Sequence, residues 1–358
     1  MSGAKKIEAD GIVITSRVRL ARNLQGHSFP GWSRKPERLQ LLELLRPSVE
    51  ALPEMKGGVC HAMDALPALD KQILVEKHLI SREHAGRNIG SAVVISRDET
   101  FSVMINEEDH LRMQAIRPGL CLEKVYALID GVDTRLAGAL PFAFSPKLGY
   151  LTACPTNVGT GMRASAMLHL PALVLADHMD KIISAVGKLG LAVRGLYGEG
   201  TEALGNLFQI SNQMTLGERE AEIVGRLEKV VSEIVRHEIN ARATLLEKTP
   251  RMLYDHIGRA YGVLAHARII SSKECINLLS MIQLGVALDA FGGLNAEDVE
   301  QLFVETQPAH LQRDQGHSRL SAEERDALRA DLVRPVIARC KAPKFGIPPP
   351  TEEPPKTT

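Results

Sequence analysis

Short apolar runs bounded by Gly, Asp or Asn alternate with longer amphipathic stretches from residue 11 to about residue 235. Runs rich in β-branched residues predict strands, and they lie at 11–14, 91–96, 101–105 and 191–194. Apolar residues at three- and four-residue spacing predict helices over 37–52 and 163–188. This alternation indicates a mixed α/β domain of the catalytic type.

Beyond about residue 236 the strand signals fade and helix starts follow one another. Ser272 and Asn295 stand before apolar-periodic segments and are expected N-caps. Ser321 and Glu324 have the spacing of a capping box. The expected parts are a catalytic domain over 1–240, a helical domain over 241–342 and a disordered, proline-rich tail over 343–358.

Composition narrows the class of ligand. The chain has 358 residues, which is enough for one large domain and a smaller one with a self-sufficient core. Its 43 Lys and Arg balance its 43 Asp and Glu, so no long-range field attracts nucleic acid or an anionic membrane. We therefore expect neither as a partner, and any charged ligand must be recognised locally.

Cysteine usage indicates the compartment. The five cysteines lie far apart and form no C-x-x-C pair, which argues against a disulfide framework and a zinc site. No secretory leader is evident at the N-terminus, and no apolar run approaches the roughly 18 residues of a membrane span. We expect a soluble protein of the reducing cytoplasm.

An acidic turn, Asn106–Arg112, follows one of the predicted strands. Three consecutive acids are usually a solvated loop, and that alternative stands for the segment taken alone. Arg112 favours a site, because a carboxylate beside an arginine suits a pocket that holds a cation on one side and phosphate on the other.

Two arginines flank Val18 in the next candidate segment. Arg17 and Arg19 are two residues apart, so on a strand their side chains share a face. A pair of rigid, permanently charged guanidinium groups is a good phosphate clamp. The alternative is a solvent-exposed basic strand edge.

The segment Cys154–Arg163 supplies a cysteine, a Pro- and Gly-containing loop and a further arginine. Since a helix is predicted after it, its amides are expected to face an anion at a helix N-terminus. It is not a Walker A loop, because no G-x-x-x-x-G-K-[ST] occurs in the chain. The alternative is a buried structural cysteine.

The segment Arg194–Glu199 ends in a glycine-rich stretch. Gly198–Ala203 matches a dinucleotide-binding pattern, but Glu199 would place a like charge against pyrophosphate, so we reject that interpretation. Glycines around Glu199 are typical of a mobile loop that delivers a carboxylate on closure. Together, the four segments indicate phosphoryl transfer onto a guanidinium.

Read in order, the four segments resemble the ATP:guanido phosphotransferases, the arginine and creatine kinases. The matching motifs are T-S-R-V-R from residue 15, N-E-E-D-H-L-R from residue 106, C-P-T-N-V-G-T-G-M-R-A-S from residue 154 and V-R-G-x-x-G-E from residue 193. The resemblance covers roughly residues 11–240. It implies an α+β fold, a large antiparallel sheet flanked by helices, with the all-helical C-terminal domain following it.

The resemblance also implies roles for individual residues. Glu108 and Glu199 would grip the acceptor guanidinium with Cys154 beside it, and Glu107 would meet Mg²⁺ through water. The residues implied at the ATP site are Ser16, Arg17, Arg19, His78, Arg112, Arg163, Ala164, Ser165, Arg194, Gly195 and Gly198. ATP and Mg²⁺ are the implied cofactors.

Two departures favour one branch of this family. Only residues 1–15 precede Ser16 and the first arginine pair, so we expect the helical domain that encloses a small substrate in the phosphagen kinases to be absent here. The chain instead carries R-D-x-x-R-A near its end, which resembles bacterial protein arginine kinases of the McsB type. In those kinases the element lines a regulatory phosphoarginine pocket, here Arg325, Asp326, Arg329 and Ala330. An ordinary salt-bridged helix face is the alternative.

A further departure lies in the fourth motif, where Tyr197 replaces an arginine of animal arginine kinases. The resemblance implies a kinase that phosphorylates exposed arginines of proteins, which marks them for a Clp-type AAA+ protease, often with a zinc-binding activator protein. A kinase of free arginine or another small guanidine, and a catalytically silent phosphoarginine-binding adaptor, remain alternatives. Apolar helices around residues 278–288 are compatible with a homodimer.

Overall fold

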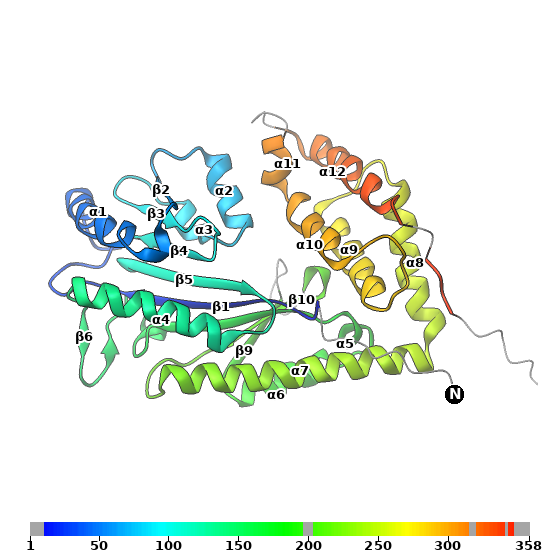
Figure 1. Ribbon diagram of the computed structural model, residues 1–358, viewed down its shortest axis with the longest axis horizontal. Helices are drawn as coiled ribbons and strands as arrows, with labels where there is room; N and C mark the ends of the chain where they lie inside the picture. Colours follow the sequence, from blue (N-terminus) through cyan, green and yellow to red (C-terminus); the bar gives the residue numbers. More distant parts are fainter. Residues whose placement is uncertain (1–10, 196–202, 315–319, 341–342, 347–358) are drawn as a thin grey trace, which may run out of the picture.

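The structure of the protein is a computed structural model that describes residues 11–195, 203–314, 320–340 and 343–346 (Figure 1). The predictions for Gly198, Glu199 and residues 347–358 lie outside these described residues.

An eight-stranded antiparallel sheet forms the centre of the molecule, in the strand order β2-β3-β4-β5-β1-β8-β10-β9. Its strands are β1 (Val13–Arg22), β2 (Val59–Ala62), β3 (Ala92–Ile95), β4 (Phe101–Ile105), β5 (Leu111–Pro118), β8 (Met162–His169), β9 (Leu191–Gly195) and β10 (Leu207–Asn212). A small hairpin, β6 (Phe144–Ser145) and β7 (Gly149–Tyr150), stands apart from it. The α+β prediction is confirmed.

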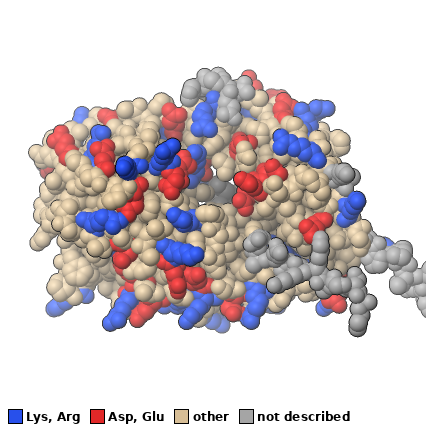
Figure 2. Space-filling view, in the orientation of Figure 1, with Lys and Arg blue, Asp and Glu red and all other residues tan. Residues whose placement is uncertain are grey.

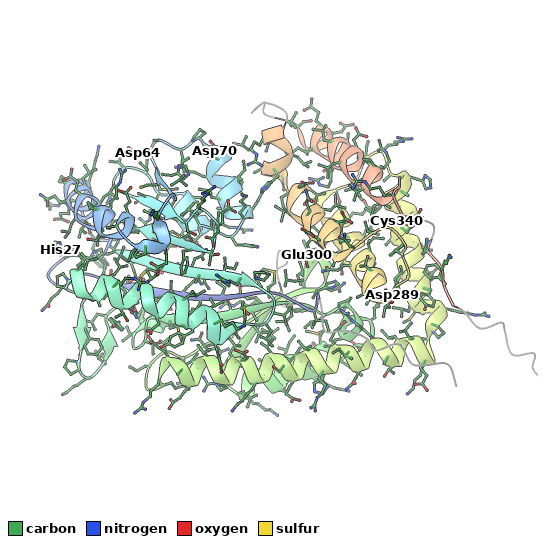
Figure 3. The ribbon with its side chains drawn as sticks, in the orientation of Figure 1. His27, Asp64, Asp70, Asp289, Glu300 and Cys340 are labelled. Carbon is green, nitrogen blue, oxygen red and sulfur yellow. The ribbon has the colours of Figure 1, made fainter. Side chains whose placement is uncertain are left out.

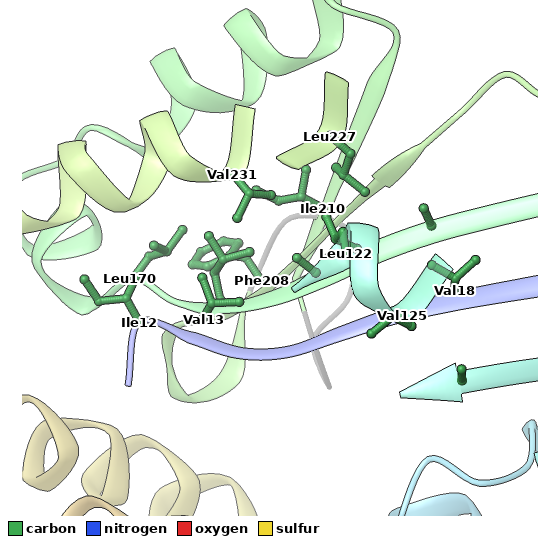
Figure 4. Close-up of a cluster of buried hydrophobic side chains, with 14 of the residues drawn as sticks. Ile12, Val13, Val18, Leu122, Val125, Leu170, Phe208, Ile210, Leu227 and Val231 are labelled. Carbon is green, nitrogen blue, oxygen red and sulfur yellow. The ribbon is translucent and has the colours of Figure 1, made fainter. Parts of the chain in front are cut away.

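Helices cover one face of this sheet and enclose the main core with it. They are α1 (Lys35–Glu50), α4 (Leu122–Ala139), α5 (Pro171–Leu175), α6 (Met179–Lys188) and α7 (Glu220–Lys248). Strand residues such as Val18, Phe208 and Ile210 pack against Leu122 of α4 and Val231 of α7 (Figure 4). Burial of this apolar area is the main source of stability for the domain.

The opposite face is apolar only at one end. Val93, Ile95 and Met104 alternate with residues of the main core along β3 and β4, and they pack in a second cluster with Leu79 and Ile80. The helices α2 (Ala68–Glu76) and α3 (Arg82–Ala85) lie at this end. The remainder of this face, over β5, β1, β8 and β10, carries polar side chains and forms the floor of the candidate site.

Beyond α7 the chain is helical in every described element. The helices are α8 (Pro250–His266), α9 (Ser272–Ala287), α10 (Ala296–Glu305), α11 (Pro308–Asp314) and α12 (Ala322–Ile337), and Figure 1 shows them together at one end of the sheet. The caps at Asn295 and Ser321 are confirmed. For α9 the N-cap is Ser271, one residue before the expected Ser272, because the Ser271 hydroxyl accepts from the Glu274 amide.

The predicted helix over 163–188 is wrong in its first third. Residues 162–169 form β8, a central strand between β1 and β10, and α5 and α6 follow it. A central strand with a buried residue at most positions reads as a continuous apolar run, which helical spacing also fits.

Two segments cross the boundaries that the sequence suggested at residues 240 and 342. The long helix α7 runs through residue 240 and joins the sheet to the helical region. At residues 343–346 the chain is packed, since Phe345 lies 4.7 Å from Tyr254 between ring centroids and the Lys344 amide donates to Ala290. The apolar residues of α9, including Leu279, Ile282 and Leu284, are buried within the described chain.

Candidate active site

The strand register brings four arginines to the polar face of the sheet. Arg19 of β1 lies opposite Gln114 of β5 and opposite Arg163 of β8. Residues directly opposite in an antiparallel pair share a face, and so do residues two apart on one strand. Arg17 and Arg112 therefore project to the same side as Arg19 and Arg163.

A fifth arginine comes from the far edge of the sheet. Arg194 of β9 lies opposite Gln209 of β10. The Gln209 side chain is on the cleft face, since its Oε1 accepts from Nη2 of Arg17 at 3.0 Å. Nη2 of Arg163 donates to the Ser211 hydroxyl oxygen at 3.2 Å, and Ser211 is two residues from Gln209 on β10. The five arginines that the sequence singled out thus converge, although they come from four strands.

The arginines line one cavity of about 780 Å³. Its other walls come from the end of β9 at Gly195, from the α2–α3 region and from the helical region. The lining residues of the last two include His78, Ser81, Glu83, Ser272, Ile276, Gln307, Pro308, Ala309 and Gln312. The volume is in the range of pockets that enclose a nucleotide-sized ligand. Figure 2 shows basic and acidic side chains interspersed over one face, with a hollow between the two halves of the molecule.

Burial and mutual repulsion make this arginine cluster electrostatically unfavourable by itself. Burial, followed by the charges of Arg112 and Arg163, lowers the pKa of Arg17 to about 10. Burial and the neighbouring arginines also lower the pKa of Arg19 well below its usual value. The Nε atoms of Arg19 and Arg163 are buried without a hydrogen-bond partner. A polyanion in the cavity would supply both the charge and the acceptors.

Arg112 differs from the others because a carboxylate holds it. Both oxygens of Glu107 accept from Nη1 of Arg112, at 2.9 and 2.7 Å, and the Ser81 hydroxyl donates to the same carboxylate. Burial opposes ionisation of Glu107, but Arg112 and Ser81 outweigh it, so the pKa of Glu107 is lowered. The Glu107 side chain is 0% exposed. It orients Arg112, and no part of it is open to a magnesium-bound water.

Glu108 is the exposed residue of the turn between β4 and β5, while its neighbours Glu107 and Asp109 are buried. Burial of part of the side chain, followed by repulsion from Asp109 and Glu107, raises the pKa of Glu108. A cation placed beside this turn would relieve that repulsion. The turn is therefore built to receive a positive group from solvent.

Asp109 joins this turn to the cysteine segment. One of its carboxylate oxygens accepts from Nδ2 of Asn23 at 2.6 Å and from the Ala153 amide at 2.7 Å. Cys154 follows directly, half-buried, with its Sγ 3.0 Å from Oγ1 of Thr156. Asp109 thus joins the turn that carries Glu108 to the segment that carries Cys154, and the sequence alone did not identify this role.

The cysteine segment has a different local structure from the one expected. Pro155–Asn157 is a single 3₁₀ turn and the strand β8 follows, so no helix N-terminus faces the site. Gly159 adopts φ 116°, and a Cβ there would stand 2.2 Å from the Thr215 carbonyl oxygen. This close backbone approach requires glycine. Arg163 is delivered by a strand instead of a helix.

The remaining residues implied at the ATP site divide into two groups. His78 and Gly195 line the cavity. Burial and then Arg17 lower the pKa of His78 to about 4, so its ring is neutral at pH 7. Ser165 lies opposite Arg17 on the cleft face, but it is 1% exposed.

Ser16 and Ala164 have side chains on the other face of the sheet. The Ser16 hydroxyl donates to Gly119 and accepts from the Cys121 amide, and Ala164 belongs to the main core. The structure therefore contradicts a side-chain contact of either residue with ATP. The period of two along each strand explains why, because each residue adjoins an arginine that faces the cleft.

The C-terminal R-D-x-x-R-A element lies on α12. Arg329 is 1% exposed, and it donates to the backbone carbonyls of Thr306 and Ile270 and to Asp326. Arg325 is half-buried, and it donates to the Leu320 carbonyl. Ala330 is buried. Arg329 ties α12 to the neighbouring turns through these hydrogen bonds. Arg325 is therefore the more accessible guanidinium of the element.

Within the described residues no three or more His, Cys, Asp or Glu side chains gather as a metal site. Among the described helices, none combines the length and apolar character needed to cross a bilayer.

Comparison with known proteins identifies the family. The family model described as ATP:guanido phosphotransferase, C-terminal catalytic domain, matches residues 41–241, which is more than half of the chain. The chain belongs to the ATP:guanido phosphotransferase family. A second model, the protein-arginine kinase McsB C-terminal domain, matches residues 250–347. Within the family, the chain therefore belongs with the protein-arginine kinases, and it is an enzyme of the kinase class that uses ATP.

Full-length relatives agree with this assignment. The chain is 47% identical over 324 residues to a protein-arginine kinase of Halalkalibacterium halodurans, covering 90% of this chain and 91% of that protein. It is 46% identical over 333 residues to a protein-arginine kinase of Moorella thermoacetica, covering 91% and 94%.

Solved structures of the family share the fold. A taurocyamine kinase from Schistosoma mansoni with bound transition-state analogue components aligns at a TM-score of 0.55 and 27% identity, over 65% of this chain and 33% of that chain. A lombricine kinase aligns at a TM-score of 0.57 and 24% identity, over 67% and 72%, and this likeness bears on the fold alone.

Several contacts in the site could not be predicted from the sequence pattern. Ser81 and Gln209 are common polar residues outside the motifs, and only the folded chain shows that they contact Glu107 and Arg17. Asp109 lies in the acidic turn, but its contact with the cysteine segment carried no signal in the sequence. Glu76 is similar, since its carboxylate accepts from the Ala309 and His310 amides and so fastens α11 over the cleft. The period of two along β5 was one usable signal, because it places Gln114 beside Arg112.

Proposed function

We propose that the protein transfers the γ-phosphate of ATP to arginine side chains of other proteins. The observation that carries the proposal is the convergence of Arg17, Arg19, Arg112, Arg163 and Arg194 on one cavity, next to a turn that presents the exposed carboxylate Glu108. The five arginines suit a triphosphate, and the Glu108 carboxylate suits a guanidinium. The two substrates would meet where the arginine-lined cavity borders the turn of Glu108.

Two observations favour a protein acceptor over a small guanidine. The curated relatives that match nearly the whole chain are named protein-arginine kinases. Glu108 is also exposed on the described surface, so a residue carried on a bulky chain can reach it. The four motifs and the carboxylate at the turn favour a catalyst over a silent phosphoarginine-binding adaptor.

In the proposed reaction a guanidinium nitrogen of the acceptor attacks the γ-phosphorus of ATP. The N–P bond forms, the bond from phosphorus to the bridging oxygen of ADP breaks, and the nitrogen loses one proton. Glu108 and Glu199 would orient the nitrogen in line, and one of them would take its proton, because an arginine guanidinium with a pKa above about 12 is a poor nucleophile while protonated. Cys154 would lie beside the acceptor.

The arginines would stabilise the charge that spreads over the transferred group. Their guanidinium groups are fixed on strands, so little reorganisation accompanies the reaction. Mg²⁺ would arrive with the nucleotide and neutralise phosphate charge. The buried Glu107 does not fit the water-mediated contact expected for it, and its role is to position Arg112.

We further propose the division into a catalytic part over 1–240, a helical regulatory part over 241–342 and a tail over 343–358. The R-D-x-x-R-A element would bind phosphoarginine mainly through Arg325, since Arg329 is engaged with backbone carbonyls. Cytoplasmic location, a homodimer, an activator protein and delivery of marked proteins to a Clp-type protease belong to the same proposal, and the relatedness to protein-arginine kinases supports it.

The test uses purified full-length protein with Mg-ATP and two acceptors in parallel, free arginine and an unfolded protein. Acid-labile phosphate and mass spectrometry of phosphoarginine are the readouts. We expect phosphoarginine on the protein and little on free arginine. Preference for free arginine would refute a protein as the acceptor. Absence of both products would refute the kinase assignment.

A further inference from the structure

A loop on the acceptor side of the site is fastened to the turn that carries Glu108. The Leu24 amide donates to Nδ1 of His110 at 3.0 Å, and Nε2 of His110 lies 2.9 Å from the Ser28 carbonyl oxygen. The rings of His27 and His110 lie edge to face with centroids 6.3 Å apart. His110 is two residues from Glu108, so the loop over residues 25–33 borders the acceptor turn.

The loop is internally ordered. The Ser33 hydroxyl lies 2.8 Å from the Ser28 carbonyl oxygen and 2.9 Å from the Phe29 carbonyl oxygen, and the amides of Trp32 and Ser33 both donate to Phe29. Arg38 of α1 donates to the Ser33 carbonyl. The backbone around Trp32 is therefore held in one conformation before any partner arrives.

Trp32 is the only tryptophan of the chain, and its side chain is 86% exposed. Single exposed apolar residues are common on protein surfaces. A tryptophan side chain is larger than most, with about 200 Å² of surface. Its burial against a partner is therefore strongly favourable. Placed on an ordered loop, it loses little conformational entropy on binding.

The position of the loop indicates what the partner is. Figure 3 places His27 of this loop at the end of the molecule far from the helical region, which closes the phosphate cavity. A segment that brings an arginine to Glu108 from solvent must extend several residues past the turn, at about 3.3 Å per residue. Such a segment would pass the loop over residues 25–33, in which the Ser28 carbonyl contacts both His110 and the hydroxyl of Ser33, the residue after Trp32.

We propose that the loop over residues 25–33 is a docking surface for the polypeptide that carries the acceptor arginine, with Trp32 packing against an apolar side chain near that arginine. The occupant is an extended segment of an unfolded protein, because such a segment offers an arginine and a nearby apolar side chain together on accessible backbone. The inference rests on the proposed function and names how its substrate is held.

The single tryptophan makes the proposal directly measurable. The probe is reduced, carboxymethylated ribonuclease A, an arginine-bearing unfolded protein without tryptophan. On titration into the full-length kinase, we expect the tryptophan emission to shift to the blue and to saturate near the KM of this substrate. Emission that does not move at saturating substrate overturns the proposal.

Kinetics supply an independent measurement. Trp32→Ala should raise KM for the unfolded protein about tenfold, and Trp32→Phe should raise it less. The KM for ATP and kcat with N-acetylarginine amide should stay within twofold of wild type. Ile269→Ala is the matched control, because Ile269 is 59% exposed but lies in the helical region, and we expect no change. An unchanged KM in Trp32→Ala overturns the proposal.

The outcomes separate this inference from the proposed function. If wild-type protein phosphorylates neither acceptor, the kinase assignment fails, whereas the emission shift still reports docking. If emission depends on the concentration of the kinase alone, Trp32 belongs to an interface between copies of this chain, and the docking proposal is wrong.

Discussion

The phosphate end and the acceptor end of the site are built in opposite ways. At the phosphate end, five arginines stand on four strands of the sheet and line a cavity of about 780 Å³. At the acceptor end, Glu108 stands on a turn, exposed, beside the cysteine segment and an ordered loop. Strands give the fixed geometry that charge stabilisation needs, while turns and loops leave access for a bulky acceptor.

The two ends also carry opposite electrostatic strain. Burial and neighbouring positive charges lower the pKa values of Arg17 and Arg19, whereas burial and neighbouring carboxylates raise the pKa of Glu108. A ligand of the opposite charge would relieve this repulsion at either end. The comparison predicts that mutations at the two ends change different kinetic constants.

The largest effect is expected at the phosphate end. Arg19→Met should lower kcat/KM for ATP by about 10³-fold, because it removes a buried charge from the centre of the cluster. The melting temperature should not fall, since the variant relieves repulsion among arginines. Steady-state kinetics and thermal unfolding give both values.

Arg117→Met is the control for this variant. Arg117 lies on the same sheet opposite Ser16, so its side chain is on the face away from the cleft, and activity should stay within twofold. Loss of activity in Arg19→Met together with a lower melting temperature would indicate misfolding and contradict the clamp.

At the acceptor end, Glu108→Gln should lower kcat by about 10²-fold, the usual scale for a lost acid–base group, while the Kd of ATP stays within twofold. Calorimetric ATP binding and single-turnover phosphorylation measure the two quantities. Unchanged turnover would remove Glu108 from the mechanism. A much weaker ATP affinity would show that the two ends are not separable.

Glu107→Gln tests the link between the ends. The variant removes the charge that holds Arg112, so Arg112 should lose its fixed orientation and kcat/KM for ATP should fall by about tenfold to 10²-fold. Ser81→Ala, which removes a neutral donor from the same carboxylate, should have a smaller effect. Equal effects of the two variants would argue against Arg112 as the group that matters.

The smallest effect is a difference in pH dependence. Arg17, with a pKa of about 10, stays charged throughout, so the Kd of ATP should vary little between pH 6 and 8 on account of the protein. Glu108 must be ionised to take a proton, and its raised pKa means that it protonates at a higher pH than the ~4.3 of an ordinary glutamate. Activity should therefore fall on the acid side before ATP binding does.

Profiles of kcat/KM for the acceptor and of Kd for ATP, recorded from pH 5 to 8, measure this difference. In Glu108→Gln the acid limb that Glu108 causes should disappear from the residual activity. An acid limb that persists unchanged in this variant would assign it to another group.

Much of the fold and site was predictable because it depends on local pattern. The strands β3, β4 and β9 follow from the apolar runs, and the run at 11–14 gave only the start of β1. The caps at Asn295 and Ser321 follow from short-range hydrogen bonds. Prediction failed at β8, where burial on both faces hides the period of two. For Ser16, whose motif adjoins the cleft, a place at the ATP site stays a prediction, and its side chain faces the core.

The order of residues along the chain determined which chemical groups are available and which of them share a side of each strand, because side-chain direction alternates with every residue. Arg17 and Arg19 are a pair for that reason alone. Tertiary structure decided that strands distant in sequence pair in a register that sets Arg19 opposite Arg163, that Arg329 is buried against two carbonyls, and that His110 holds the loop of Trp32 beside Glu108. These contacts join residues up to 144 positions apart, and their geometry depends on packing across the whole sheet.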